Sequence, residues 1–339
     1  MLGRLDATQT PICLDWTGSG FEVLFKGEEL WVELEAPVRK PDMWVLATVD
    51  GHPITRFPVQ EGRHWYPLVL GMSADNTRKV TLMKETQAMP AAPEATVMVH
   101  GLRYEGELLP LPEPALRIEF IGDSITAGAS TSKTYWEYLE EILNPMSMKA
   151  MGVSGSCVSA TSDYGTSNSP LINRYTSIPD SDVITIFMGT NDYGHETPLG
   201  TIEDKGDISF YGALNTIIPG ILSAHPSSRL IWITPTHRYG RGTSGILGTA
   251  FTYDYIPNGR GHNLKDYVDA IKAVCERHSV PVIDLFNISG IDPSVSEMRS
   301  KYMPDGLHPN AAGHEKIASI IAANWVQQAA KWGCSPVLA

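Results

Sequence analysis

Short stretches of alternating apolar and polar residues fill the first hundred positions of the chain. They have a period of two or are rich in β-branched and aromatic residues, as β-strands are. The predicted strands cover residues 21–25, 30–34, 44–49 and 80–83. Pairs of turn-forming residues are expected to separate them at Lys26-Gly27, Asp50-Gly51, Glu61-Gly62 and Asp75-Asn76. Regularly spaced short strands favour an antiparallel β-sandwich or jelly roll.

The pattern changes after a proline-rich segment, in which Pro110, Pro112 and Pro114 hold the chain extended. Beyond it, apolar runs typical of buried parallel strands alternate with stretches of helical periodicity. The predicted strands are residues 116–121, 183–188, 230–234 and 281–285, and the predicted helices are residues 134–143, 209–224, 264–278 and 313–330. We therefore expect a β-sandwich accessory domain at residues 1–112, followed by a doubly wound α/β domain with a parallel sheet at residues 113–339.

Composition and charge restrict the kinds of molecule that the protein is expected to bind. The chain has 339 residues and a formal net charge of −12, and an acidic surface repels nucleic acids and anionic membranes. The apolar runs fall short of the roughly 20 residues that span a bilayer. The first residues lack the layout of a signal peptide, which predicts a cytoplasmic protein. The four cysteines and ten histidines show no metal-binding spacing, so we expect neither a metal nor another cofactor.

Ligands of open α/β sheets bind at the carboxyl ends of the strands, so the residues directly after each strand are the first candidates for a site. Ser124 closely follows a predicted strand, at a position where a helix is expected to begin. Backbone N–H groups at a helix start can stabilise a negative oxygen, as acyl transfer requires. Taken alone, a serine in this position is better explained by a role as helix N-cap.

A serine hydroxyl is a weak nucleophile unless a base removes its proton. His308 is the candidate base, and Asp305, three residues earlier, can orient its imidazole ring and stabilise the imidazolium. The structural alternative for this segment is a solvated loop that caps the final helix through Asn310.

Two further segments can supply donors to a developing oxyanion. Asn191 follows the most apolar strand, and its side-chain amide can donate a hydrogen bond to such an oxygen. Gly155 follows a short predicted strand, and a glycine lets the backbone approach a ligand closely. Each segment by itself is compatible with a turn. Together the four segments supply a nucleophile, a base, a carboxylate that orients the base, and oxyanion donors.

These four segments, in this order, resemble the conserved blocks of the SGNH/GDSL hydrolase superfamily. The resemblance covers the predicted α/β domain and implies a flavodoxin-like fold. It implies that Ser124, His308 and Asp305 form the catalytic set of a serine esterase. It further implies an oxyanion hole made by the N–H groups of Ser124 and Gly155 and the side-chain amide of Asn191.

A second resemblance concerns the two-domain layout. A β-rich domain ahead of an SGNH domain, with the strings at residues 18–23 and 118–126, is similar to carbohydrate esterase family two. Members of that family remove acetyl groups from plant polysaccharides such as xylan and mannan. The chain departs from the family's frequent C-G-Y-G string at residues 127–130. The resemblance implies an O-acetylesterase whose partner is an acetylated oligosaccharide. The alternatives are a broad-specificity small-acyl esterase or thioesterase of the GDSL type, and a non-catalytic glycan-binding protein.

Polar and aromatic side chains near the expected catalytic face suit a sugar substrate, because they combine a flat apolar surface with a hydrogen-bonding tip. We predict that Asp123, Tyr193, His195 and His237 bind the substrate. The tryptophans of the first domain, at positions 16, 31, 44 and 65, are expected to fill its core.

Overall fold

A computed structural model gives the structure of the protein and describes residues 10–14, 17–37, 43–85, 96–111, 116–143, 147–161, 169–239 and 253–331. The chain divides into two compact units, Met1–Pro114 with Thr131–Lys133 and Ala115–Ser130 with Thr134–Ala339. The domain boundary predicted between residues 112 and 113 lies outside the described residues. Among the helices of the described residues, none combines the length and the apolar character that a membrane span requires.

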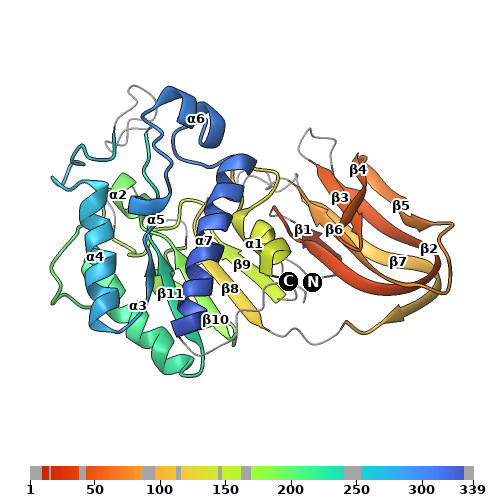
Figure 1. Ribbon diagram of the computed structural model, residues 1–339, viewed down its shortest axis with the longest axis horizontal. Helices are drawn as coiled ribbons and strands as arrows, with labels where there is room; N and C mark the ends of the chain where they lie inside the picture. Colours follow the sequence, from red (N-terminus) through yellow and green to blue (C-terminus); the bar gives the residue numbers. More distant parts are fainter. Residues whose placement is uncertain are drawn as a thin grey trace. The chain divides into compact units, whose positions relative to one another are not determined.

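The first unit is an antiparallel sheet of seven strands with an apolar core (Figure 1). The strands are β1 (Ile12–Leu14), β2 (Gly20–Ala36), β3 (Trp44–Val49), β4 (His52–Pro58), β5 (Gly62–Leu70), β6 (Thr77–Lys84) and β7 (Val97–Leu109). Their order is β1-β7-β2-β6-β3-β4, and β5 pairs with β2 beside this path. The first part of β2 pairs with β6 and its second part with β5, so this strand joins both parts of the sheet. The predicted antiparallel β-domain is confirmed.

Strand β2 replaces two strands and a turn that the sequence predicts. Its apolar residues at alternate positions from 30 to 36 are wholly buried, as one core-facing side of a strand requires. The predicted turn at Lys26-Gly27 is wrong, because the strand continues through it with a shift of register. Gly27 faces Gly106 of β7, and a Cβ on Gly27 would lie 2.2 Å from the main-chain oxygen of Glu105. Glycine is needed for the close approach of two strands.

In the described part of this unit the tryptophans lie outside the core, contrary to the prediction. The described ones are Trp31, Trp44 and Trp65, and Trp16 lies outside the described residues. The Arg103 guanidinium lies over the rings of Trp31 (5.0 Å) and Trp65 (4.9 Å), and Arg56 lies over Trp44 (4.2 Å). Cation–π contacts of this kind stabilise half-exposed rings. Aliphatic residues and phenylalanine fill the core in their place.

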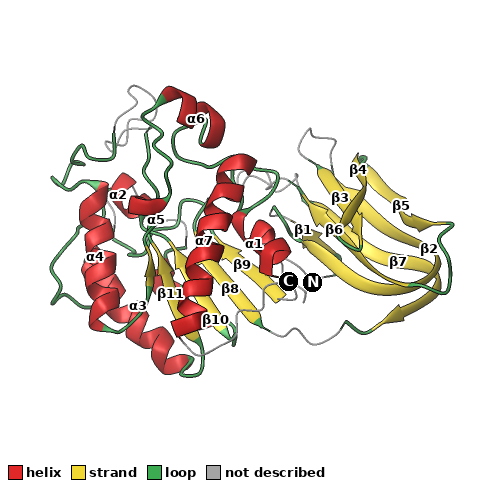
Figure 2. Ribbon diagram, viewed as in Figure 1, coloured by secondary structure: helices red, strands yellow, loops and turns green. Residues whose placement is uncertain are grey.

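The second unit contains a five-stranded parallel sheet (Figure 2). Its strands are β8 (Arg117–Gly122), β9 (Ser147–Gly152), β10 (Val183–Phe187), β11 (Arg229–Ile233) and β12 (Val282–Ile283). Their order, β12-β11-β10-β8-β9, is the flavodoxin-like order, in which the chain direction across the sheet reverses between β8 and β10. All residues of β10 are buried, as expected of a central strand covered on both faces. The predicted doubly wound α/β domain is confirmed.

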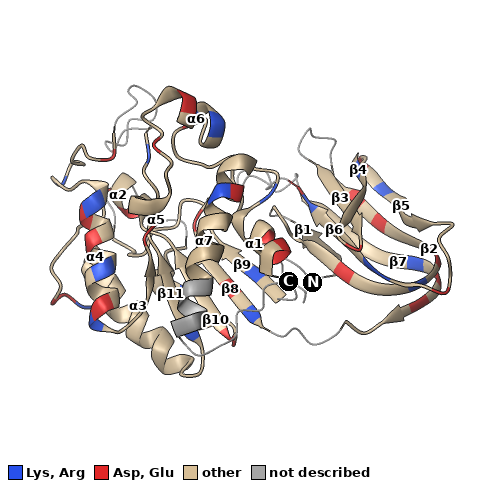
Figure 3. Cartoon of the chain, viewed as in Figure 1, with Lys and Arg blue, Asp and Glu red and all other residues tan. Residues whose placement is uncertain are grey.

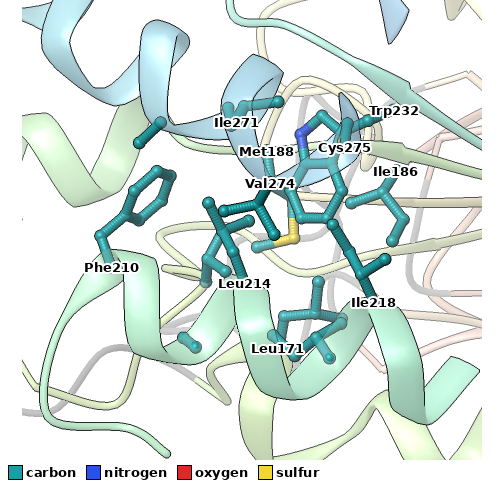
Figure 4. Close-up of a cluster of buried hydrophobic side chains, with 14 of the residues drawn as sticks. Leu171, Ile186, Met188, Phe210, Leu214, Ile218, Trp232, Ile271, Val274 and Cys275 are labelled. Atoms are coloured by element: carbon teal, nitrogen blue, oxygen red, sulfur yellow. The ribbon is translucent and has the colours of Figure 1, made fainter. Parts of the chain in front are cut away.

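Helices cover both faces of this sheet. They are α1 (Tyr135–Leu143), α2 (Thr190–Gly194), α3 (Phe210–Ala224), α4 (Leu264–Arg277), α5 (Leu285–Ile288), α6 (Ser296–Tyr302) and α7 (Ala311–Lys331), with short 3₁₀ turns η2 (Leu171–Asn173) and η3 (Tyr175–Ser177). The four long helices lie within two residues of their predicted limits. One apolar cluster joins α3 and α4 to the sheet, and a second joins α1 and α7 to it. Figure 4 shows the first cluster, where Leu214 of α3 and Val274 of α4 meet.

Charged residues of both signs are mixed over the surface of this unit. Figure 3 shows basic and acidic positions following each other along α4, where Lys265 and Asp269 form an ion pair one turn apart. The start of α4 carries a capping box, in which the side chains of Asn263 and Asp266 each accept a hydrogen bond from the other residue's N–H. These local contacts fix where α4 begins, at the carboxyl side of the sheet.

Candidate active site

Ser124 lies on a tight turn that directly follows β8 at the carboxyl edge of the sheet. Asp123 Oδ1 accepts a hydrogen bond from the Ile125 N–H (2.9 Å), and the Ser124 carbonyl accepts one from the Ala129 N–H (2.9 Å). The predicted helix start at Ser124 is wrong, because α1 begins only at Tyr135. The turn holds Ser124 in a fixed position, with 7% of the residue exposed.

Two glycines allow the turn to pack this tightly. A Cβ on Gly122 would lie 1.9 Å from Thr126 Oγ1. A Cβ on Gly152, the last residue of β9, would lie 2.3 Å from the Ala127 nitrogen. The end of β9 is therefore in direct contact with the turn that carries Ser124, and no larger residue fits at either glycine without a shift of the main chain.

The three predicted catalytic side chains are hydrogen-bonded in series. Ser124 Oγ lies 3.0 Å from His308 Nε2, and His308 Nδ1 lies 2.7 Å from Asp305 Oδ2. Burial raises the pKa of Asp305, but its hydrogen bonds with His308 and with the Leu307 N–H outweigh burial and lower the pKa to about 2. Asp305 is therefore ionised and holds the proton of a neutral imidazole on Nδ1. His308 Nε2 is then free to accept the proton of the Ser124 hydroxyl.

The loop that carries Asp305 and His308 is anchored to its surroundings. The Tyr239 N–H donates a hydrogen bond to the Gly306 carbonyl (2.7 Å). At the other end, Asn310 Oδ1 accepts a hydrogen bond from the Gly313 N–H (3.0 Å) at the start of α7. The two explanations that the sequence offers for this segment are compatible, since Asn310 caps the final helix while His308 faces Ser124.

Gly155 follows β9 and has a left-handed backbone, with a φ of 75°. Glycine adopts this conformation without strain. In the part of the chain that the structure describes, the N–H groups of Ser124 and Gly155 have no hydrogen-bond acceptor. Both groups are thus available to an oxygen of a bound molecule.

Asn191 and Asp192 tie helix α2 to the segment that follows Gly155. Asn191 Nδ2 donates a hydrogen bond to the Ser156 carbonyl (3.1 Å), which leaves the second hydrogen of this amide for another acceptor. Asp192 accepts hydrogen bonds from the N–H groups of Val158 (2.9 Å) and Ser159 (3.2 Å). Burial raises the pKa of Asp192 to about 7, although these hydrogen bonds lower it. The segment of Asn191 and Asp192 therefore positions the segment that follows Gly155.

Arg174 is a residue of this site that the sequence did not indicate. Its guanidinium donates hydrogen bonds to the carbonyls of Gly122 (2.9 Å) and Met151 (3.1 Å), near the ends of β8 and β9. It also contacts Ser156 Oγ (3.5 Å). One side chain thus joins the strand ends that precede Ser124 and Gly155. A lone arginine outside any motif carries no sequence signal for this role, because its partners are main-chain carbonyls.

The predicted substrate-binding residues differ in exposure. Tyr193 is 1% exposed, and its hydroxyl donates a hydrogen bond to the Ile256 carbonyl (2.9 Å). Asp123 is also 1% exposed, and its carboxylate supports the turn of Ser124. His195 is half-buried, and burial lowers the pKa of its imidazole. The His237 side chain is 39% exposed. For all four residues the substrate role stays a prediction.

Comparison with known families identifies this arrangement. Residues 120–316 match the model of the GDSL-like lipase/acylhydrolase family. The chain belongs to this family. Residues 1–112 match the model of the carbohydrate esterase 2 N-terminal domain, so the two resemblances noted from the sequence are confirmed. No curated protein sequence matches the chain. Within the described residues of this GDSL-like protein, no three His, Cys, Asp or Glu side chains are grouped to hold a metal ion.

Several solved structures share the fold of this GDSL-like protein. An acetyl xylan esterase from Butyrivibrio proteoclasticus is 20% identical with a TM-score of 0.66, over 98% of this chain and 95% of that one. A family two carbohydrate esterase from Clostridium thermocellum, in complex with cellohexaose, is 21% identical with a TM-score of 0.63, over 96% of this chain and 98% of that one. A protein from Lactobacillus plantarum is 29% identical with a TM-score of 0.55, over 64% of this chain and 99% of that one. The protein is a carboxylic ester hydrolase with the two-domain fold of these esterases.

Proposed function

We propose that the protein is a serine O-acetylesterase that removes acetyl groups from plant-type oligosaccharides, such as fragments of acetylated xylan or mannan. The observation that carries this proposal is the hydrogen-bonded series from Ser124 Oγ through His308 to Asp305, with distances of 3.0 Å and 2.7 Å. A serine, a histidine of fixed tautomer and an ionised carboxylate in this order can perform acyl transfer.

In the proposed reaction, Ser124 Oγ attacks the acetyl carbonyl carbon while His308 Nε2 takes the hydroxyl proton. The carbonyl oxygen becomes an oxyanion, which the N–H groups of Ser124 and Gly155 and the amide of Asn191 stabilise. As the tetrahedral intermediate collapses, His308 gives the proton to the departing sugar oxygen, and the acetyl group stays on Ser124. A water molecule then attacks this ester with His308 again as base, which releases acetate and restores Ser124.

Asp305 has two tasks in this scheme. It keeps the proton of neutral His308 on Nδ1, and it stabilises the positive charge that His308 carries after it has accepted the serine proton. The low pKa of Asp305, about 2, supports both tasks, because the carboxylate stays ionised well below neutral pH.

The carbohydrate part of the proposal is supported by the relatives. One similar structure is called an acetyl xylan esterase, and another was solved with cellohexaose bound. The first unit of this chain also matches the N-terminal domain of carbohydrate esterase family 2. An acetylated oligosaccharide is therefore the substrate that we propose.

Release of acetate from acetylated xylo- and manno-oligosaccharides tests the proposal. We expect acetate from at least one of these series with the wild-type protein and none above background with Ser124→Ala. Cleavage of long-chain esters or thioesters without any acetate from the glycans would overturn the carbohydrate assignment. A Ser124→Ala variant that keeps the wild-type rate would overturn the mechanism.

A further inference from the structure

A cavity of about 570 Å³ lies at the carboxyl ends of β11 and β12, within the second unit. Its volume is in the range of about 300 to 1,000 Å³ that is usual for sites of small molecules. His237, Tyr255, Phe286 and Asp292 are among the residues that line it, and Ser124, His308 and Asp305 are not. We call this cavity the His237 pocket.

A short run of tyrosines links the His237 pocket to the loop of the proposed catalytic base. The Tyr239 N–H donates to the carbonyl of Gly306, which lies between Asp305 and His308. The Tyr239 ring contacts Tyr253 at a centroid distance of 4.8 Å, and Tyr253 stacks on Tyr255 at 4.8 Å with an interplanar angle of 24°. Tyr253 and Tyr255 line the pocket, and Tyr255 is 63% exposed. A run of contacting tyrosine rings thus connects the catalytic loop to the pocket.

His237 is the polar centre of the pocket. Its Nδ1 lies 2.8 Å from Asp254 Oδ2, which also accepts the Arg238 N–H (2.9 Å). The imidazole ring lies against Phe286 at a centroid distance of 4.0 Å. Asp254 therefore fixes the ring and its tautomer, while Nε2 has no hydrogen-bond partner among the residues that the structure describes. This nitrogen is available to a group of a bound molecule.

The charged groups of the pocket already have protein partners. Lys265 pairs with Asp269, and Asp292 accepts hydrogen bonds from the N–H and hydroxyl of Ser294. The lining also balances two cations, Arg238 and Lys265, against two carboxylates, Asp254 and Asp292, so no large excess of one charge is left for a strongly ionic ligand. A neutral molecule with an apolar face and hydroxyl groups fits best, since a hydroxyl can donate to or accept from His237 Nε2 in either protonation state.

We propose that the His237 pocket binds the glycosyl units that neighbour the acetylated ring, with a pyranose face on Tyr255 and a sugar hydroxyl on His237 Nε2. This inference rests on the proposed function and names the site that selects long over short saccharides. Aromatic stacking combined with a few oriented hydrogen bonds is how such pockets fix the orientation of a ligand.

The test compares substrates that differ only in the number of sugar units. For the wild-type protein, we expect kcat/KM for acetylated xylo- or manno-oligosaccharides to rise from the monosaccharide to the trisaccharide. His237→Gln and Tyr255→Ala should each lower kcat/KM for the trisaccharide by about fivefold to tenfold more than for 4-nitrophenyl acetate, the loss expected for one hydrogen bond or one stacking contact. His225→Gln is the matched control, because His225 also contacts a carboxylate, that of Asp180 (2.9 Å), at the opposite edge of the sheet.

Binding without turnover separates this inference from the proposed function. In the Ser124→Ala background, calorimetry with unacetylated oligosaccharides should give a dissociation constant that His237→Gln raises about fivefold. Equal losses on the trisaccharide and on 4-nitrophenyl acetate would overturn the pocket assignment while the esterase function stands. A change in acyl-chain preference without a change in saccharide-length preference would identify an acyl pocket and also overturn it. Failure of the wild-type protein to release acetate from any glycan would instead overturn the proposed function.

Discussion

Two histidine–aspartate pairs at the carboxyl edge of the parallel sheet have nearly equal geometry. His308 Nδ1 lies 2.7 Å from Asp305, and His237 Nδ1 lies 2.8 Å from Asp254. Both pairs leave Nε2 pointing away from the carboxylate, yet only His308 Nε2 has a serine hydroxyl, at 3.0 Å, among the described side chains. The difference teaches that the pair alone does not make a catalytic base. The turn after β8, which brings Ser124 to one of the two imidazoles, decides which pair can support acyl transfer.

The largest expected effect is the difference in kcat between variants of the two histidines. His308→Ala should lower kcat for 4-nitrophenyl acetate by at least about 10⁴-fold, because the nucleophile loses its base. His237→Ala should lower it by at most about tenfold. Steady-state kinetics of the two purified variants, with thermal unfolding curves to verify their folding, provide the measurement. Similar losses in both variants would contradict the assignment of His308 as base.

The next effect concerns the two carboxylates. Asp305→Ala should lower kcat by about 10²-fold to 10⁴-fold, which is less than the loss in His308→Ala, because the imidazole remains but is no longer oriented. Asp254→Ala should mainly raise KM for oligosaccharides. Measuring kcat and KM separately on a trisaccharide substrate distinguishes the two outcomes, and a kcat loss of equal size in Asp254→Ala would mean that both pairs take part in the chemistry.

Sequence reasoning found one of these pairs and missed the other. Asp305 and His308 are three residues apart, and each strand of a parallel sheet ends at the same edge, so Ser124, Gly155 and Asn191 could be assigned to a common site from their positions after strands. Asp254 is separated from His237 by 17 positions and follows no predicted strand. Nothing in the sequence indicates that the two side chains meet.

The errors elsewhere have related physical causes. Lys26-Gly27 has the composition of a turn, but its glycine serves the close approach to Gly106 in β7, a strand that the sequence pattern did not reveal. Likewise, Arg174 binds main-chain carbonyls, which every residue possesses, so no residue type along the chain points to its partners. The burial of Tyr193 could not be predicted either, because a loop position after a strand does not tell whether a ring turns to the core or to solvent.

A smaller effect is expected at Arg174, which positions the turn that carries Ser124. Arg174→Met removes the hydrogen bonds to the Gly122 and Met151 carbonyls, so the turns of Ser124 and Gly155 lose their common anchor. We expect kcat to fall by about tenfold to a hundredfold with little change in KM, because small displacements of catalytic groups are costly.

Arg174→Lys provides the conservative comparison, since it keeps one charged donor. It should recover part of the lost kcat, and low concentrations of free guanidinium should raise kcat of Arg174→Ala. A variant that is merely less stable would show neither recovery, and that result would exclude a positioning role for Arg174.

The smallest expected effect is on the free energy of unfolding, to which the contact between His308 and Asp305 contributes in addition to its role in catalysis. The pKa of Asp305 is about 2 in the folded protein and 3.8 for the free side chain, so the folded state favours the ionised form. The resulting stability is present above pH 4 and is lost as the pH falls through about 2. Because the Asp305 side chain is 43% exposed, solvent screening reduces the contribution to about 1 kcal/mol. Urea unfolding of the wild type and Asp305→Asn should give free energies of unfolding that differ at pH 6 and converge by this amount toward pH 2. Parallel curves over the whole range would show that the contact serves catalysis alone.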